Sequence, residues 1–170
     1  DSKGVVVTNN HVIQGAEDIL VRVNGDKEYE ATVIGGDPLS DIAVLQIKSK
    51  EKFTSVKFGD SNTARIGDWV IAIGNPFGLG GTVTSGIISA RNRSLGGALA
   101  RYEDFIQTDA SINQGNSGGP LFDMEGNVIG INTAILGQSG SIGIGFSIPS
   151  NSAKKVIDQL IKYGETKRGW

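Results

Sequence analysis

The chain has 170 residues, of which 38% are hydrophobic, and its formal net charge is -2 at pH 7. These values predict a soluble globular protein, large enough for one compact domain or for two small barrels. The weak and dispersed charge argues against nucleic acid or an anionic membrane as the partner. The sequence has no cysteine and one histidine, which argues against disulfides and zinc, and we expect no metal and no cofactor.

Short β-branched segments separated by glycine-rich turns dominate the chain, which has 25 glycines. Many short strands with such turns are typical of an all-β barrel or sandwich. The Asn24-Gly25 dipeptide gives the strongest hairpin prediction, because both residues tolerate positive φ. The predicted strands cover residues 5–8, 19–23, 29–34, 42–47, 69–73, 82–90, 104–108, 128–132 and 144–148.

One helix is predicted near the carboxyl end, where Ala153, Val156, Ile157, Leu160 and Ile161 recur at helical spacing. A second, short helical turn is expected at residues 12–15, after the histidine. A polar stretch at residues 62–65 interrupts the strands and indicates the boundary between two barrels. No apolar run reaches the length of a membrane-spanning helix, and no signal segment is recognised.

The residue types required for nucleophilic catalysis occur in the order His11, Asp41, Ser117. Ser117 lies among glycines, where a tight turn can project its hydroxyl group toward a substrate. Histidine has an ordinary pKa of ~6.5, which suits a base that takes the serine proton at neutral pH. An aspartate can hold the histidine tautomer, so the three residues could form a triad if the fold brings them together.

The segment around Ser117 also predicts an oxyanion hole at Gly115, Asn116 and Ser117, with the N–H groups of Gly115 and Ser117 as donors. Gly115 can take positive φ without a steric penalty. Residues 115–119 also satisfy the G-x-S-x-G pattern of α/β-hydrolases, but that fold needs a histidine after the serine and none follows. Taken singly, a lone histidine such as His11 is usually structural, and a cap is the alternative role for Asp41.

Six motifs follow one another along the chain: TNNHV at 8–12, SDIAVL at 40–45, GNPFG at 74–78, QTDASIN at 107–113, GNSGGPL at 115–121 and GIGFSIP at 143–149. Together they resemble the HtrA (Deg) serine proteases, and most closely the DegP/DegQ/DegS branch. The resemblance implies an all-β, chymotrypsin-like double β-barrel with a C-terminal helix. It also implies an ATP-independent serine endopeptidase that cleaves unfolded or misfolded proteins in the bacterial periplasm, with a homotrimer as the basic unit.

The resemblance assigns roles to individual residues. His11 becomes the general base, Asp41 its orienting group and Ser117 the nucleophile. Residues 93–102 match the family's sensor loop, which relays regulatory contacts to residues 111–116, with Arg93 as the relay; a solvated loop arginine is the alternative. The positions that line the primary specificity pocket, with core packing as an even alternative, match Ile112, Ile142 and Ile144.

We expect an N-terminal barrel at residues 1–62 that lacks its first strand, and a C-terminal barrel at 63–149. The helix would cover 150–164, and residues 165–170 would begin a linker to a PDZ domain absent from this chain. Alternatives to a broad protease are a regulatory protease that cuts one partner and a chaperone-like module that holds unfolded chains. A structural β-barrel with a coincidental triad is the most distant alternative.

Overall fold

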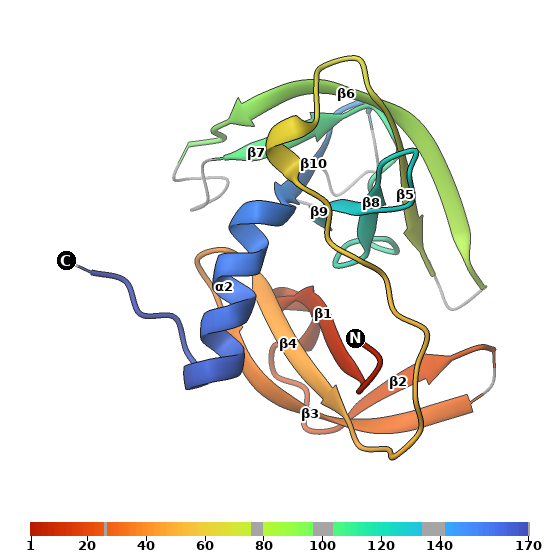
Figure 1. Cartoon of the computed structure of the whole chain (residues 1–170), viewed down its shortest axis with the longest axis vertical. Coiled ribbons are helices and arrows are strands. Elements are labelled where there is room, and N and C mark those ends of the chain that lie inside the picture. Colours follow the sequence, from red (N-terminus) through yellow and green to blue (C-terminus); the bar gives the residue numbers. More distant parts are fainter. Residues whose placement is uncertain (26, 76–79, 97–103, 134–141, 170) are drawn as a thin grey trace. The chain divides into compact units, whose positions relative to one another are not determined.

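A computed structural model of the chain describes residues 1–25, 27–75, 80–96, 104–133 and 142–169. It divides into two compact units (Figure 1). The first unit contains Asp1–Val56 and Lys155–Trp170, and the second contains Lys57–Lys154. The predicted all-β class with a C-terminal helix is confirmed, because strands dominate both units and one long helix follows them.

The first unit is built on a four-stranded antiparallel sheet in the order β1-β4-β3-β2. Its apolar strand β4 is central and is buried along almost its whole length, as expected for a strand paired on both sides. The Asn24-Gly25 hairpin is confirmed, with φ of 52° and 88° at these two residues. The elements are β1 Val5–Asn9, α1 Asn10–Ile13, β2 Ile19–Val23, β3 Lys27–Asp37 and β4 Ile42–Ile47.

The second unit is a closed antiparallel barrel in the order β10-β7-β6-β5-β8-β9. Alternate side chains of its strands point inward and form an apolar core that includes Val70, Ile88, Ile106, Leu121 and Ile129. Its elements are the 3₁₀ helix η1 Ser61–Thr63 and the strands β5 Trp69–Gly74, β6 Thr82–Arg93, β7 Phe105–Thr108, β8 Pro120–Phe122, β9 Val128–Thr133 and β10 Gly145–Pro149.

The structure adds three local details to the elements predicted from the sequence. Strand β8 was not predicted, because three residues are too few to show an alternating pattern. The helical turn near the histidine begins at Asn10 and ends at Ile13, earlier than expected. The polar stretch at 62–65 overlaps η1, whose Asp60 side chain accepts a hydrogen bond from the Asn62 N–H group at its start.

The predicted C-terminal helix is α2, Ser150–Tyr163. Ala153, Ile157 and Leu160 are buried on one face, as the spacing predicted, whereas Ile161 is half exposed. The helix ends at Gly164, which has φ of 73° and donates its N–H group to the Leu160 carbonyl oxygen at 2.8 Å. The segment that follows therefore turns away from the helical path.

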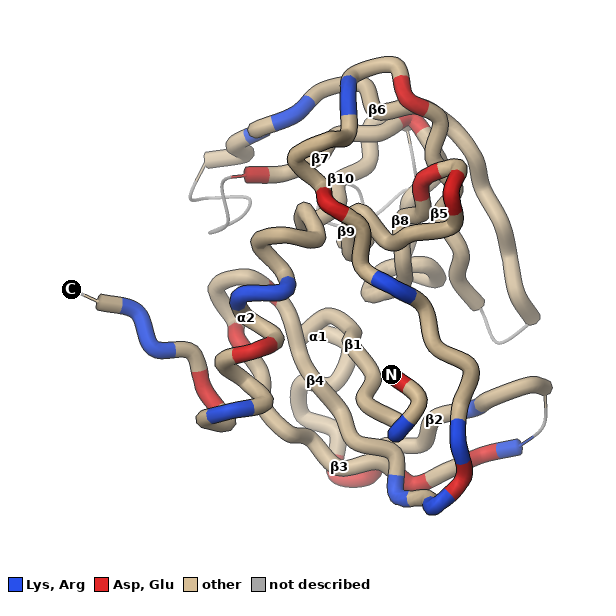
Figure 2. Tube along the Cα trace, viewed as in Figure 1, with Lys and Arg blue, Asp and Glu red and all other residues tan. Residues whose placement is uncertain are grey.

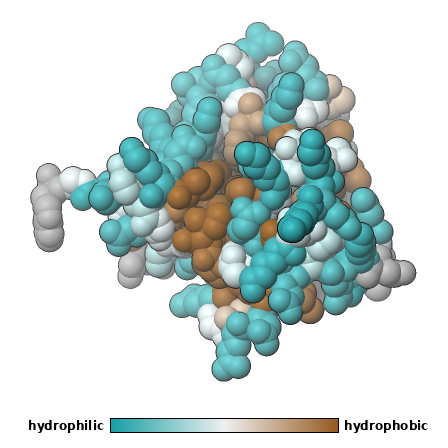
Figure 3. Space-filling view, turned by 60° about the horizontal axis from the view of Figure 1, so that its bottom comes forward, coloured by the Kyte–Doolittle hydropathy of each residue, from teal (hydrophilic) through white to brown (hydrophobic). Residues whose placement is uncertain are grey.

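Acidic and basic residues are interspersed along the chain, and neither sign forms one large cluster (Figure 2). Apolar surface is visible among hydrophilic residues on the face shown in Figure 3. In the first unit, exposed apolar side chains include Leu20 on β2 and Val33 on β3. None of the helices within the described ranges is long and apolar enough to cross a membrane.

Candidate active site

His11 and Asp41 are brought together in the first unit, although 30 residues separate them in the sequence. Nδ1 of His11 lies 2.6 Å from Oδ2 of Asp41. The backbone N–H group of His11 also donates to Oδ1 of Asp41 at 2.9 Å. The carboxylate thus contacts both the ring and the main chain of one residue, which restrains the orientation of the imidazole.

The backbone of Asp41 is held in an unusual conformation, with φ of 58°. This left-handed region costs a residue other than glycine roughly 1–2 kcal/mol, so surrounding contacts must stabilise it. The Asp41 carbonyl oxygen accepts two hydrogen bonds, from the Asn10 N–H group and from Nδ2 of Asn9, both at 2.9 Å. Asn9 is fully buried at the end of β1. Strand β1 and α1 therefore fix Asp41 through its main chain.

The hydrogen bond to Asp41 raises the pKa of the His11 imidazole above its ordinary value, although partial burial of the ring acts in the opposite direction. With an ionised Asp41, Nδ1 carries the proton and donates a hydrogen bond to the carboxylate. Nε2 is then the acceptor nitrogen. The His11 side chain is 47% exposed, and Nε2 is the ring nitrogen with the lone pair that a general base uses.

Ser117 lies in the second unit, in the turn that leads into β8. Gly118, the next residue, has φ of 86° and donates its N–H group to the Asn132 carbonyl oxygen at 2.7 Å. A β-carbon at Gly119 would lie only 2.5 Å from the Ile73 carbonyl oxygen. The two glycines are therefore needed for the sharp turn after Ser117, one for its conformation and the other for space.

Two backbone N–H groups of the predicted oxyanion hole have partners in this structure. The Ser117 N–H group donates to the Asn113 carbonyl oxygen at 3.1 Å, and the Asn116 N–H group donates to the same oxygen at 3.2 Å. The Ser117 N–H group, predicted as an oxyanion donor, is therefore engaged within its own loop in this conformation, because a helical turn at residues 113–117 closes this bond. Positive φ occurs at Gly118 and not at Gly115.

The Asn116 side chain closes the same loop. Its Oδ1 accepts the Asn113 N–H group at 2.9 Å, and its Nδ2 donates to the Ser111 carbonyl oxygen at 2.8 Å. Asn116 is buried, so these bonds are shielded from water. The loop before Ser117 is therefore held by a compact local network.

Asn132 is a buried polar residue on β9 that the sequence analysis treated only as part of a strand. Its backbone N–H group donates to the Gly119 carbonyl oxygen at 2.9 Å. Its Nδ2 donates to the Pro120 carbonyl oxygen at 3.0 Å, and its Oδ1 accepts the Ser147 hydroxyl group at 2.7 Å. Asn132 thus anchors the residues directly after Ser117. The only signal in the sequence was an amide in an apolar strand.

Replacing Asn132 by alanine is expected to lower the free energy of unfolding by about 1–3 kcal/mol, because the Pro120 carbonyl and Ser147 hydroxyl groups lose a buried partner. Urea unfolding measures this loss of free energy in Asn132→Ala and in the control variant Asn62→Ala, each against the unmutated protein. Asn62 is exposed, and its side chain makes no hydrogen bond among those the structure describes. Equal stabilities of the two variants would contradict an anchoring role.

The three isoleucines predicted to line a specificity pocket differ in exposure. Ile112 is buried in the barrel core, where a β-carbon on Gly145 would approach its Cγ1 to 2.5 Å. Ile142 is 74% exposed and Ile144 is 39% exposed. Ile112 thus has a packing role in this structure, and the two others are accessible.

Arg93 is the last residue of β6 and pairs with Phe105 on β7. Residues 97–102 of the predicted sensor loop, and residues 76–78 of the GNPFG motif, lie outside the described residues. The loop at 111–116, to which the sensor loop would relay contacts, is described in full.

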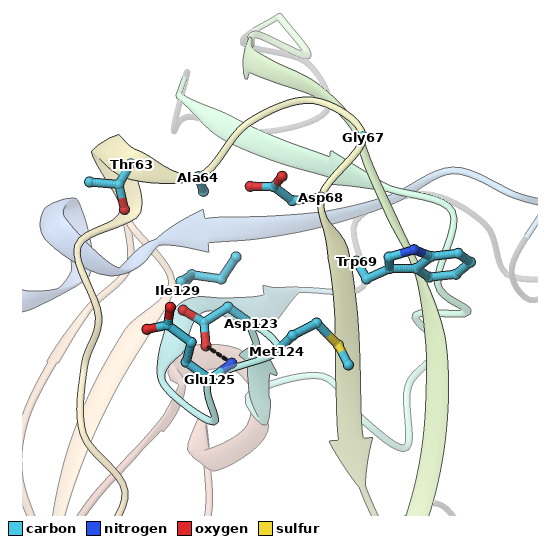
Figure 4. Close-up of a pocket in the computed structure, with 9 residues that line it drawn as sticks. All are labelled: Thr63, Ala64, Gly67, Asp68, Trp69, Asp123, Met124, Glu125 and Ile129. Carbon is cyan, nitrogen blue, oxygen red and sulfur yellow. Dashed lines mark hydrogen bonds between the residues drawn. The ribbon is translucent and has the colours of Figure 1, made fainter.

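The second unit also contains a pocket of about 420 Å³ (Figure 4). Trp69 and Met124 line it together with Asp68, Asp123 and Glu125. The Asp123 carboxylate accepts the Glu125 N–H group at 3.0 Å, so this aspartate stabilises the turn. The pocket contains none of the predicted site residues, and no metal-binding group of histidine, aspartate and glutamate occurs in the described part of the chain.

Comparison with known proteins identifies the class to which this fold and site belong. The family model of the trypsin-like peptidase domain matches residues 1–131. A "probable periplasmic serine endoprotease DegP-like" of Brucella suis is 59% identical over 98% of this chain and 33% of its own length. The "periplasmic serine endoprotease DegP" of Salmonella typhimurium is 54% identical over 99% of this chain and 35% of its own length.

Solved structures agree with these sequence matches. The HtrA-type protease AlgW with a decapeptide superposes with a TM-score of 0.94 and 51% identity, covering 100% of this chain and 52% of that one. AlgW with a tripeptide gives the same TM-score and identity over 56% of its length. The chain therefore belongs to the trypsin-like peptidase domain family and, within it, to the HtrA (Deg) serine proteases. It spans about one third of the length of the curated relatives that it matches.

Proposed function

We propose that this chain is the catalytic domain of a serine endopeptidase in which Ser117 is the nucleophile, His11 the general base and Asp41 its orienting group. The contact of 2.6 Å between His11 and Asp41 carries this proposal. It leaves Nε2 as the acceptor nitrogen on an exposed ring, which a base for a serine hydroxyl group requires. The glycine turn around Ser117 supports the assignment of the nucleophile.

In the proposed mechanism, Nε2 of His11 takes the proton of Ser117 as Oγ attacks the carbonyl carbon of the scissile peptide bond. The C–O bond forms and the carbonyl π electrons move to oxygen, which gives a tetrahedral oxyanion. His11 then donates its proton to the leaving amine, the C–N bond breaks, and the acyl group remains on Ser117. Water repeats the sequence and releases the second product.

We further propose that the loop before Ser117 must rearrange before the oxyanion can bind. The Ser117 N–H group is engaged by the Asn113 carbonyl oxygen. One oxyanion donor contributes about 3–4 kcal/mol in the transition state, so losing it lowers the rate by two to three orders of magnitude. Arg93 and the loop that follows it would relay the regulatory contacts that open the Asn113 bond, with Gly115 as the second donor.

Family membership supports a proposal for the substrate class. Relatives named periplasmic endoproteases and HtrA-type structures with bound peptides support extended polypeptides as substrates in the bacterial periplasm. We propose unfolded or misfolded proteins as the targets, in quality control or in an envelope stress response, with the homotrimer as the working unit. Ile142 and Ile144 would favour an aliphatic side chain before the scissile bond.

A fluorophosphonate that phosphonylates activated serines tests the assignment. We expect one modified residue, located at Ser117 by peptide mapping, and no modification in His11→Ala. Ser85→Ala, which removes an exposed serine of β6, is the matched control and should be labelled normally. Labelling elsewhere, labelling that survives His11→Ala, or no labelling of folded protein even with added peptide would contradict the proposal.

A further inference from the structure

The segment after α2 folds back onto β3 within the first unit. Lys167 donates its N–H group to Oε1 of Gln159 at 2.8 Å, which fixes the course of the chain beyond the helix. Arg168 then reaches Asp37, the last residue of β3, and both terminal nitrogens of its guanidinium group bond to the carboxylate. The Nη1–Oδ1 distance is 2.8 Å. Two parallel bonds of this kind hold both partners in a defined geometry.

Asp37 is not a surface residue. Its side chain is 2% exposed, whereas that of Arg168 is 45% exposed. Burial by itself raises the pKa of the Asp37 carboxyl group, but the hydrogen bonds from Arg168 and Ser40 outweigh burial and lower this pKa to about 2. Asp37 is therefore charged at neutral pH, and this buried charge depends on Arg168 for its compensation.

One oxygen of the Asp37 carboxylate, Oδ2, also holds the turn that presents Asp41. Oδ2 of Asp37 accepts the Ser40 N–H group at 3.2 Å and also the Ser40 hydroxyl group. Ser40 directly precedes Asp41, and Asp37 pairs with Ile42 directly after it. The backbone of Asp41, with φ of 58°, is thus enclosed by bonds that start at Asp37.

A second contact joins the end of β3 to the segment that carries His11. A β-carbon on Gly36 would lie 2.3 Å from Oδ1 of Asn10, so Asn10, the residue before His11, packs directly on the backbone beside Asp37. Asn10 also donates its N–H group to the Asp41 carbonyl oxygen. A shift at the end of β3 would therefore reach His11 and Asp41 together.

We propose that Arg168 is a positioning residue for the His11–Asp41 pair and acts through Asp37 and Ser40. The bidentate ion pair holds the turn at residues 38–41 closed, so that Asp41 keeps its left-handed backbone and its carboxylate stays against Nδ1 of His11. The importance of this link for catalysis rests on the proposed function. The link itself lies entirely within the first unit. Displacing Arg168 from Asp37 is therefore expected to weaken the contact between Asp41 and His11.

His11 is the only histidine in the chain, so its ring signals in an NMR spectrum are unique and report its pKa directly. In Arg168→Gln we expect the pKa of His11 to fall toward its ordinary value of 6.5, because the contact with Asp41 that raises it weakens. Arg168→Lys retains one charge-assisted bond and should restore part of the shift. Arg22→Gln breaks an exposed ion pair with Glu28 in the same unit and should leave the pKa of His11 unchanged.

The kinetic readout separates positioning from general weakening of the fold. We expect phosphonylation of Ser117 in Arg168→Gln to slow about tenfold in its maximal rate, with little change in the probe concentration that gives half of that rate. Ser40→Ala keeps the Arg168 ion pair and removes only the hydroxyl bond to Asp37. Ser40→Ala should also lower the pKa of His11. It replaces Arg168→Gln in the test if Arg168→Gln does not fold.

An unchanged pKa of His11 in folded Arg168→Gln, or in Ser40→Ala if Arg168→Gln is unfolded, would overturn the proposal. The proposed function fails in a different way. If the pKa shifts but the unmutated protein is not phosphonylated at Ser117, Arg168 positions the His11–Asp41 pair and the assignment of Ser117 is wrong.

Discussion

Replacing Ser117 by alanine is expected to lower kcat for peptide hydrolysis by about a million-fold, because no acyl-enzyme can form without Oγ. A fluorogenic peptide with valine before the scissile bond gives the rate. The substitution removes one oxygen atom and leaves the glycine turn intact, since the bond from the Gly118 N–H group to Asn132 does not involve the serine side chain. Thermal unfolding should therefore be almost unchanged.

Ser85→Ala is the control, and its kcat should equal that of the unmutated protein. The double variant Ser117→Ala, His11→Ala should be no slower than either single variant, because residues that act in one step do not contribute additively. Residual hydrolysis above about 1% of the original rate in Ser117→Ala would contradict the nucleophile assignment, since a hundredfold loss is too small for a missing nucleophile.

Replacing Asp41 by asparagine is expected to lower kcat by about 10,000-fold while the site keeps its shape. The carboxylate accepts from both the ring and the N–H group of His11, and a neutral amide can offer its own N–H group to Nδ1 instead. That favours the tautomer with the proton on Nε2, which cannot take the serine proton. Steady-state hydrolysis of the valine peptide measures the loss.

The same variant should change the pH dependence of the residual activity. Asp41 raises the pKa of His11, and the base must be neutral, so the rate falls as pH drops below this pKa. Without the carboxylate the pKa decreases, and the acid limb of the kcat/KM profile moves to lower pH. Asp18→Asn, an exposed carboxylate of the same unit, is the control. An unshifted acid limb in Asp41→Asn would contradict the pairing.

The raised pKa of His11 also has a consequence for stability. Protonated His11 is favoured in the folded state, so its pairing with Asp41 stabilises the fold fully below about pH 6.5, and this contribution is lost as pH rises through the raised value. Because both groups are partly exposed, the contribution is small. The main role of the pair is therefore orientation and not stability.

Residue chemistry and local pattern determined much of this protein. The β-branched segments predicted nine strands of the structure because alternation and turn residues are local signals. Helix α2 followed from its apolar spacing, and Asn24-Gly25 predicted its hairpin. His11, Asp41 and Ser117 could be chosen as candidates because few residue types support nucleophilic catalysis and the chain has only one histidine.

Tertiary structure decided the remainder, because it depends on contacts that no local pattern encodes. The bond of Arg168 to Asp37 joins residues 131 positions apart, and neither residue differs in sequence from an ordinary surface charge. The burial of Asn132 and the bond from the Ser117 N–H group to Asn113 depend on how strands and turns pack. Sequence thus specified which groups can react, whereas packing decided which backbone and side-chain groups hold them.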